Sequence, residues 1–163
     1  MFDQIIDHIR NHSYMSGVER DRVRVKQTEE IFTPTKLVQS SLDLLESQNP
    51  SMFKDPSKTF IDNSCGDGQF LGEILIRKIE NGSTFEQALS TVYGVDMMQD
   101  NVDLCRKRLL CGYEHLRHIV EQNIVCADAL RYHYRFDGSH PYDNETSEQK
   151  QSELLNNLFE MPT

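Results

Sequence analysis

Three acidic residues, Asp62, Asp96 and Asp128, each follow a short apolar run. A Gly-Asp-Gly sequence at 66–68 comes directly after the first of these runs. Carboxylates accept hydrogen bonds from hydroxyls and amines, and glycines let a ligand approach the backbone closely. Asp96, which follows the second run, suits the two hydroxyls of a ribose. Asp128, which follows the third run, suits an exocyclic amine. The three acids therefore outline an adenosine-shaped site; the other interpretation is that they only cap the helices that follow.

Such a site needs a parallel sheet, because the carboxyl ends of parallel strands meet at one edge. Apolar runs alternate with segments of helical periodicity after residue 58. Strands are predicted at 59–62, 91–96 and 123–128, and helices at 70–80, 84–89, 101–110 and 113–120. The prediction is an α/β fold, a doubly wound parallel sheet with right-handed crossovers that ends after its third strand.

The regions on either side of this domain differ from it in composition. A helix is predicted at 2–12, with Phe2 and Ile9 on its apolar stripe, followed by a charged connector at 17–30. A further helix is predicted to start with Thr33 as its cap and Pro34 in its first turn. We expect three parts: a helix and connector at 1–30, the α/β domain at 31–136 and an acidic tail at 137–163. In the tail, one short amphipathic helix is expected around four apolar residues, Leu154, Leu155, Leu158 and Phe159.

The composition of the 163 residues narrows the function further. The net charge is −9 and the pI about 5.1, which argues against a domain that grips duplex DNA by itself. No run approaches the roughly 20 apolar residues of a membrane span, and we expect no leader peptide. The cysteines Cys65, Cys105, Cys111 and Cys126 have no metal-site spacing and are expected to be reduced thiols in a cytoplasmic protein.

Four motifs resemble those of the S-adenosylmethionine-dependent adenine-N6 DNA methyltransferases, in their amino-terminal, cofactor-binding half. The F-T-P that precedes the first strand in that family stands at 32–34. The D-P-x-C-G-x-G-x-F motif stands at 62–70, with asparagine in place of the proline. Y-G-V-D stands at 93–96 and D-A-L at 128–130. The resemblance covers residues 20–130 and implies a class I methyltransferase, Rossmann-like fold.

The resemblance also implies the roles of individual residues. The segment around Phe32 and the glycine turn would hold the methionine part of S-adenosylmethionine, or of the product S-adenosylhomocysteine. Asp96 would take the ribose, and Asp128 would face the adenine amine. The implied cofactor residues are Ile31, Phe32, Thr33, Pro34, Asp62, Ser64, Cys65, Gly66, Asp67, Gly68, Phe70, Asp96, Met97, Met98, Asp128, Ala129 and Leu130.

The family's catalytic N/D/S-P-P-Y/F motif, which holds the target amine and stacks on a flipped base, has no clear counterpart here. The nearest residues are Ser139, Pro141 and Tyr142, either a degenerate catalytic loop or an ordinary proline turn. Three functions stay open: a methyltransferase similar to those acting on adenine in DNA, a non-catalytic subunit that binds or sequesters the cofactor, and an enzyme that cleaves it.

The missing half of the sheet has a structural consequence. In the family the first strand is central, so a chain that stops after three strands leaves the edge of 59–62 exposed. Exposed apolar edges are usually paired or covered. The candidates are residues 132–136 as an added strand, the tail helix, or another subunit. We therefore expect a homo-oligomer or a partner chain, with DNA bound only through a partner. No metal site is predicted, since no histidine has companion ligands at suitable spacing.

Overall fold

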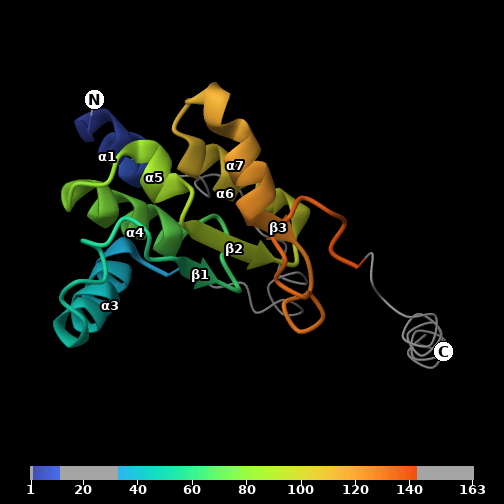
Figure 1. Ribbon diagram of the computed structural model, residues 1–163, viewed down its shortest axis with the longest axis horizontal. Coiled ribbons are helices and arrows are strands. Elements are labelled where there is room, and N and C mark those ends of the chain that lie inside the picture. The colour runs from blue at the N-terminus through green and yellow to red at the C-terminus, as the bar shows by residue number, and fades with distance from the viewer. Residues whose placement is uncertain (1, 12–32, 143–163) are drawn as a thin grey trace.

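The computed structural model describes residues 2–11 and 33–142 (Figure 1). Its elements follow in this order: α1 (Phe2–Asn11), α3 (Thr35–Gln48), β1 (Phe60–Asp62), α4 (Gln69–Glu80), α5 (Phe85–Leu89), β2 (Val92–Asp96), α6 (Gln99–Leu110), the 3-10 helix η1 (Glu114–Leu116), α7 (Arg117–Asn123) and β3 (Ile124–Cys126). The predicted alternation of strands and helices after residue 58 is confirmed.

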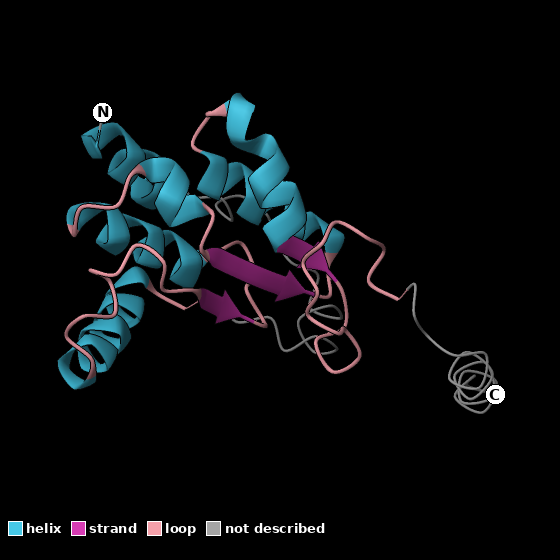
Figure 2. Cartoon of the chain, viewed as in Figure 1, coloured by secondary structure: helices cyan, strands magenta, loops and turns pink. Residues whose placement is uncertain are grey.

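The three strands form one parallel sheet in the order β1-β2-β3, with β2 in the middle (Figure 2). Phe60 pairs with Val92, and Gly94 pairs with Ile124, so neighbouring strands are in register across the sheet. The α/β class and the parallel sheet are therefore confirmed. All three strands point toward the end at which the chain leaves β3 (Figure 1).

One face of the sheet carries the main hydrophobic core. Side chains alternate between the faces of a strand, so Val92 and Gly94 face the helices while Tyr93 faces the other way. A Cβ placed on Gly94 would lie 2.9 Å from Leu71 Cδ1 of α4, which shows how closely this helix approaches β2. The rings of Phe53 and Phe60 stack at 5.3 Å in the same core. Helices α4, α6 and α7 cover this face.

The second face of the sheet carries a smaller apolar cluster and, within residues 33–142, no helix. Val95 and Ala127 meet Tyr132 here, and the Phe136 ring lies 4.8 Å from that of Tyr93. Phe136 therefore reaches back over β2 from the segment after β3. Ile61 of β1, on the same face, keeps 54% of its surface exposed.

Several predicted details are wrong. Thr33 does not cap α3: the cap position is Pro34, and no side chain there accepts a helix amide. β3 ends at Cys126, so Asp128 lies two residues beyond the strand. Residues 132–136 do not add a strand, because Tyr134 and Phe136 have φ of 52° and 48°, which is incompatible with extended backbone.

Other predictions hold at the level of single residues. Asn81 ends α4, and Thr84 begins α5 with a reciprocal capping box to Gln87. The four cysteines are free. In the described part of the chain, no helix has both the length and the apolar character needed to cross a bilayer.

Candidate functional site

The turn after β1 is hydrogen-bonded to the end of β2. The Cys65 amide donates to the Val95 carbonyl at 3.0 Å, which holds the turn beside the strand. The Gly66 amide donates to Asp96 Oδ2 at 3.0 Å. Gly66 and Gly68 have φ of 52° and 87°, a conformation that residues with a Cβ rarely adopt. The turn thus folds over the Asp96 carboxylate.

The Asp96 carboxylate is oriented by two further donors from the start of α6. The Met98 amide donates to Oδ1 at 2.9 Å, and Asn101 Nδ2 donates to the same oxygen at 3.2 Å. Asn101 itself is buried. An ionised carboxylate accepts about four hydrogen bonds, and these contacts together with the Gly66 amide account for three. Oδ2 therefore keeps acceptor capacity for a hydroxyl of a ligand.

Asp62 lies close enough to Asp96 for the two charges to interact. Its Oδ1 accepts the Ser64 amide at 3.0 Å. Burial, and then the charge of Asp96, raise the pKa of the Asp62 carboxyl, although the Ser64 hydrogen bond works against this. Two neighbouring carboxylates at one edge of the sheet create a negative potential, which suits a ligand with a positive charge or several donors.

The end of β3 completes the edge. Asp128 Oδ1 accepts the Leu130 amide at 2.9 Å, and the Ala127 amide donates to the Asp96 carbonyl at 2.9 Å. The side chains of Leu130 and Met97 are 96% and 66% exposed. Both apolar side chains are therefore accessible at this edge.

Two of the predicted cofactor residues, Cys65 and Asp67, direct their side chains into the protein, and a third, Gly68, has no room for a side chain. Cys65 is buried against Gly94, and contact with the Cys105 thiol, then burial, raise the pKa of its own thiol. Asp67 forms an ion pair with Arg108 at 3.3 Å, and both side chains are buried. A Cβ on Gly68 would lie 2.8 Å from Cys105 Sγ. At these positions only the backbone can face a ligand.

The remaining predicted residues lie around the same edge. Ser64 is exposed, Phe70 is half-buried against the main core, and Ala129 is half-buried against the second-face cluster. Thr33 is half-buried, and its carbonyl accepts Gln69 Nε2 at 3.0 Å, so the segment before α3 lies beside the glycine turn. Ile31 and Phe32 lie outside the described residues.

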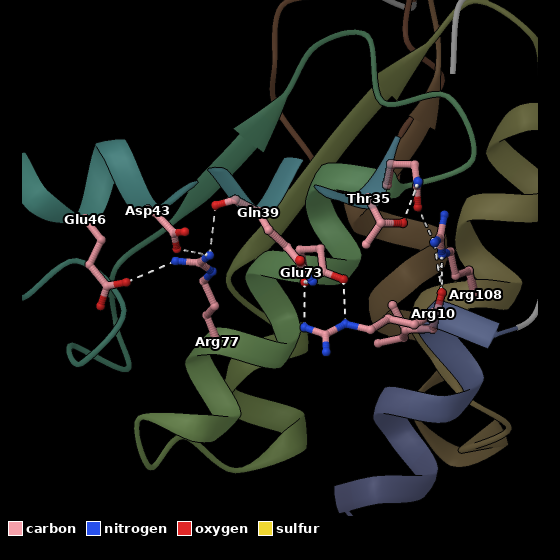
Figure 3. A network of polar contacts seen from close by, with 10 residues as sticks. Arg10, Thr35, Gln39, Asp43, Glu46, Glu73, Arg77 and Arg108 are labelled. Atoms are coloured by element: carbon pink, nitrogen blue, oxygen red, sulfur yellow. Dashed lines mark hydrogen bonds and ion pairs between the residues drawn. The ribbon is translucent and has the colours of Figure 1, made fainter. Parts of the chain in front are cut away.

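A polar network holds α1, α3, α4 and α6 together behind the turn (Figure 3). Arg10 of α1 makes two hydrogen bonds of 2.8 Å to the buried carboxylate of Glu73, which also accepts from Gln39 at 3.2 Å. Arg108 donates to the Ile9 carbonyl and to the side chain of Gln69. The turn and the 33–35 segment are thereby fixed to the helical layer.

The sequence prediction missed three residues that position the glycine turn or Asp96, namely Arg108, Asn101 and Gln69. Arg108 and Asn101 lie among apolar residues on one face of α6, and a polar residue at such a position indicates a buried partner. Gln69 links the 33–35 segment to the turn, since it contacts both the Thr33 carbonyl and Thr35 Oγ1. Of these residues, only Arg108 and Asn101 could have been found from the sequence, because they are polar residues at apolar positions of a helix.

The catalytic candidates make contacts of their own. Ser139 Oγ donates to Asp137 Oδ1 at 2.6 Å. The Tyr142 hydroxyl accepts the Asp128 amide at 2.7 Å, and the Arg131 guanidinium lies 4.8 Å from the centre of its ring. Pro141 between them is half-buried. Tyr142 therefore joins the edge beside Asp128, whereas Ser139 belongs to a local turn.

Among the residues that the structure describes, His, Cys, Asp and Glu side chains form no group of three that could hold a metal ion. Comparisons with protein-family models, with curated proteins and with solved structures found no match for this chain.

Proposed function

We propose that this chain binds S-adenosylmethionine at the carboxyl edge of its sheet, as a protein of the methyltransferase type. The observation that carries the proposal is the hydrogen bond of 3.0 Å between the Gly66 amide and Asp96 Oδ2. It joins the glycine turn to an acid that still has acceptor capacity, at the edge where ligands of open α/β sheets bind.

The donor and acceptor pattern of this edge fits the nucleoside part of the cofactor. A ribose offers two neighbouring hydroxyl donors, and Asp96 is held by three protein donors in an orientation ready to accept them. Asp128 follows β3, the strand that pairs with β2. The cationic sulfonium and ammonium groups of S-adenosylmethionine also suit the negative potential of Asp62 and Asp96.

The apolar side chains of the edge fit the adenine. Met97 directly follows Asp96, and Leu130 lies two residues after Asp128. Both are largely exposed, so covering them with a base would remove apolar surface from water. At about 25 cal/mol per Å² this is a favourable contribution of a few kcal/mol at most, and the hydrogen bonds of Asp96 would supply the specificity.

Bound S-adenosylmethionine supplies an electrophilic methyl group, which an amine can take in one displacement with the C–S bond electrons passing to sulfur. The part of this chain would be to align the cofactor and to exclude water from it. The sequence resemblance makes the N6 amine of adenine in DNA the expected acceptor. That amine would lose a proton to solvent after the transfer.

A second function, a cofactor-binding subunit without catalysis of its own, is favoured by the placement of the catalytic candidates. The Ser139 hydroxyl is engaged by Asp137, and the Tyr142 hydroxyl by the Asp128 amide. No strand in the described ranges pairs with the outer edge of β1, where the family carries its acceptor half. In this case a partner chain would supply the acceptor side.

Isothermal titration of S-adenosylmethionine into the purified protein tests the proposal. We expect micromolar binding that Asp96→Ala abolishes. Asp103→Ala is the matched control, because it removes the same charge from an exposed position of α6, where the carboxylate accepts a hydrogen bond from Gln99. The absence of heat from a folded wild-type protein, or equal losses in both variants, would contradict it.

Methyl transfer from S-adenosylmethionine with a tritiated methyl group separates the two functions. Label in DNA incubated with this chain alone supports the methyltransferase. Cofactor binding without labelled DNA supports the non-catalytic subunit. Loss of intact cofactor without a methylated acceptor would instead reveal a cleaving enzyme and contradict both.

A further inference from the structure

A groove runs along the outer edge of β1 on the second face of the sheet. It has a volume of about 490 Å³ and is lined by residues 59–61, by Tyr93 and by residues 134–136. It is separate from the glycine turn, and the inference drawn from it does not depend on cofactor binding. We call it the edge groove.

The edge groove is an apolar surface with no partner among residues 2–11 and 33–142. Ile61 and Tyr134 are exposed there, and Tyr93 is only half-buried despite its contact with Phe136. Parallel sheets are normally covered on both faces, because their strands carry apolar side chains on each side. This end of the second face therefore requires a covering segment.

Arg135 gives the edge groove a positive charge with unmet hydrogen-bonding capacity. Its Nη2 donates to the His140 carbonyl at 2.8 Å. Its Nε is buried without a hydrogen bond, and the nearest carboxylate oxygen, Asp137 Oδ2, lies 3.8 Å away. The Arg135 side chain is 21% exposed, so its guanidinium favours an occupant that brings carboxylates.

We propose that residues 143–163, the chain's own C-terminal segment, occupy the edge groove. This segment follows Tyr142, which is anchored by Asp128 and lies in the cluster on the same face. It contains five acidic residues and one lysine, so its net charge is negative and complements the positive charge of Arg135. Four of its large apolar residues, Leu154, Leu155, Leu158 and Phe159, recur with the spacing of one helix face.

The distances allow this contact within one molecule. From β3 to β1 is two strand spacings, about 10 Å. Residues 143–153, when extended, span up to about 36 Å, so the apolar residues reach the groove with chain to spare. A tethered segment has an effective concentration in the millimolar range, which favours it over a second copy at ordinary protein concentrations.

A single tryptophan tests the proposal, because the chain has none of its own. In the full-length Phe159→Trp protein, we expect emission at shorter wavelength than that of free tryptophan in water, unchanged on dilution. Ile61→Ser, in the groove, should move the emission back toward that of exposed tryptophan. Leu37→Ser, at an exposed apolar position of α3, is the control and should leave it unchanged.

A second measurement uses variants without tryptophan, so that an effect of the tryptophan on the contact is excluded. Backbone hydrogen exchange of residues 59–61 and 134–136 should speed up severalfold in Leu155→Asp/Leu158→Asp and stay unchanged in Asn156→Asp/Asn157→Asp. Emission typical of exposed tryptophan together with unchanged exchange would overturn the proposal. A short-wavelength emission that vanishes on dilution, with a doubled mass by light scattering at high concentration, would also overturn it in favour of a second copy.

Discussion

The Gly66 amide and the Asp96 carboxylate, 30 residues apart in sequence, are joined by a hydrogen bond of 3.0 Å at the carboxyl edge of the sheet. The bond fixes the course of the glycine turn and the orientation of the carboxylate at once. Because Met98 and Asn101 hold the other carboxylate oxygen, Asp96 is positioned before any ligand binds. A ligand that uses Asp96 therefore pays little for ordering it.

Gly68→Ala should lower the stability of the protein by more than the strain of its positive φ alone would cost. Gly68 has φ of 87°, and placing a side chain in such a conformation costs about 1–2 kcal/mol. The new Cβ would also lie 2.8 Å from Cys105 Sγ in the core. We expect a loss of about 2–4 kcal/mol in the free energy of unfolding, measured with urea.

Gly82→Ala is the control for Gly68→Ala. Gly82 has φ of 103°, but nothing lies within 4 Å of its Cβ position, so only the backbone strain applies. Cys105→Ala should rescue part of the Gly68→Ala loss, since it removes the clashing sulfur. Equal losses for the two glycine variants would show that Gly68 does not pack against Cys105.

Arg10→Ala should cost about 3 kcal/mol, because it leaves the Glu73 carboxylate buried with Gln39 as its remaining partner in this network. The Glu73 side chain is 3% exposed and that of Arg10 is 33% exposed, so the cost falls at the lower end of the range for buried pairs. Arg117→Ala, which breaks an exposed pair with Glu114, should cost less than about 1 kcal/mol. Similar losses in chemical denaturation would contradict a structural role for the Arg10–Glu73 pair.

Asp62→Asn should stabilise the protein at neutral pH. Burial and the charge of Asp96 raise the pKa of the Asp62 carboxyl in the folded state, so the carboxyl takes up a proton more readily in the folded protein than in the unfolded chain. The stability associated with that proton is present below the ordinary carboxyl pKa of about 3.9 and is lost as the pH rises through the raised value. Asparagine keeps an oxygen for the Ser64 amide and has no charge to bury.

The measurement for Asp62 is the difference in melting temperature between Asp62→Asn and the wild type from pH 3.5 to pH 8. We expect the advantage of the variant to grow as the pH rises and to vanish at the acidic end. An advantage that grows toward acidic pH would have the opposite sign and would show that the folded state favours the ionised carboxylate.

Met97→Ser and Leu130→Ser should weaken S-adenosylmethionine binding without loss of stability. Both side chains are largely exposed, so their replacement removes little that the folded protein buries. Covering them with adenine is expected to contribute about 1 kcal/mol each, which corresponds to roughly fivefold weaker binding per variant. Unchanged affinity in titration calorimetry, with unchanged melting temperatures, would remove these residues from the site.

Much of the fold could be predicted from the sequence because its signals are local. The capping box at Thr84 is complete within four residues, and the strands show continuous apolar runs. Thr33 was the wrong cap because the helix start depends on Pro34, whose fixed φ lets it occupy the cap position itself. Residues 132–136 alternate aromatic and polar side chains, yet positive φ at Tyr134 and Phe136 prevents a strand, and the Phe136 ring lies against Tyr93 on the second face.

The site was predictable in part for the same reason. Asp96 and the glycine turn follow directly from the parallel sheet, since both lie at carboxyl ends of neighbouring strands. The inward turn of Asp67 was not predictable, because its partner Arg108 lies on α6, 41 residues away. Long-range ion pairs of this kind leave no periodic pattern near either residue.

Amide spectra of the ¹⁵N-labelled protein, recorded while S-adenosylmethionine is added, test the central proposal most directly. We expect the amide signals of Gly66, Met97 and Leu130 to shift progressively, while those of α3 and the edge groove stay in place. A spectrum that does not change, or shifts confined to residues away from the carboxyl edge of the sheet, would contradict a cofactor site at the glycine turn.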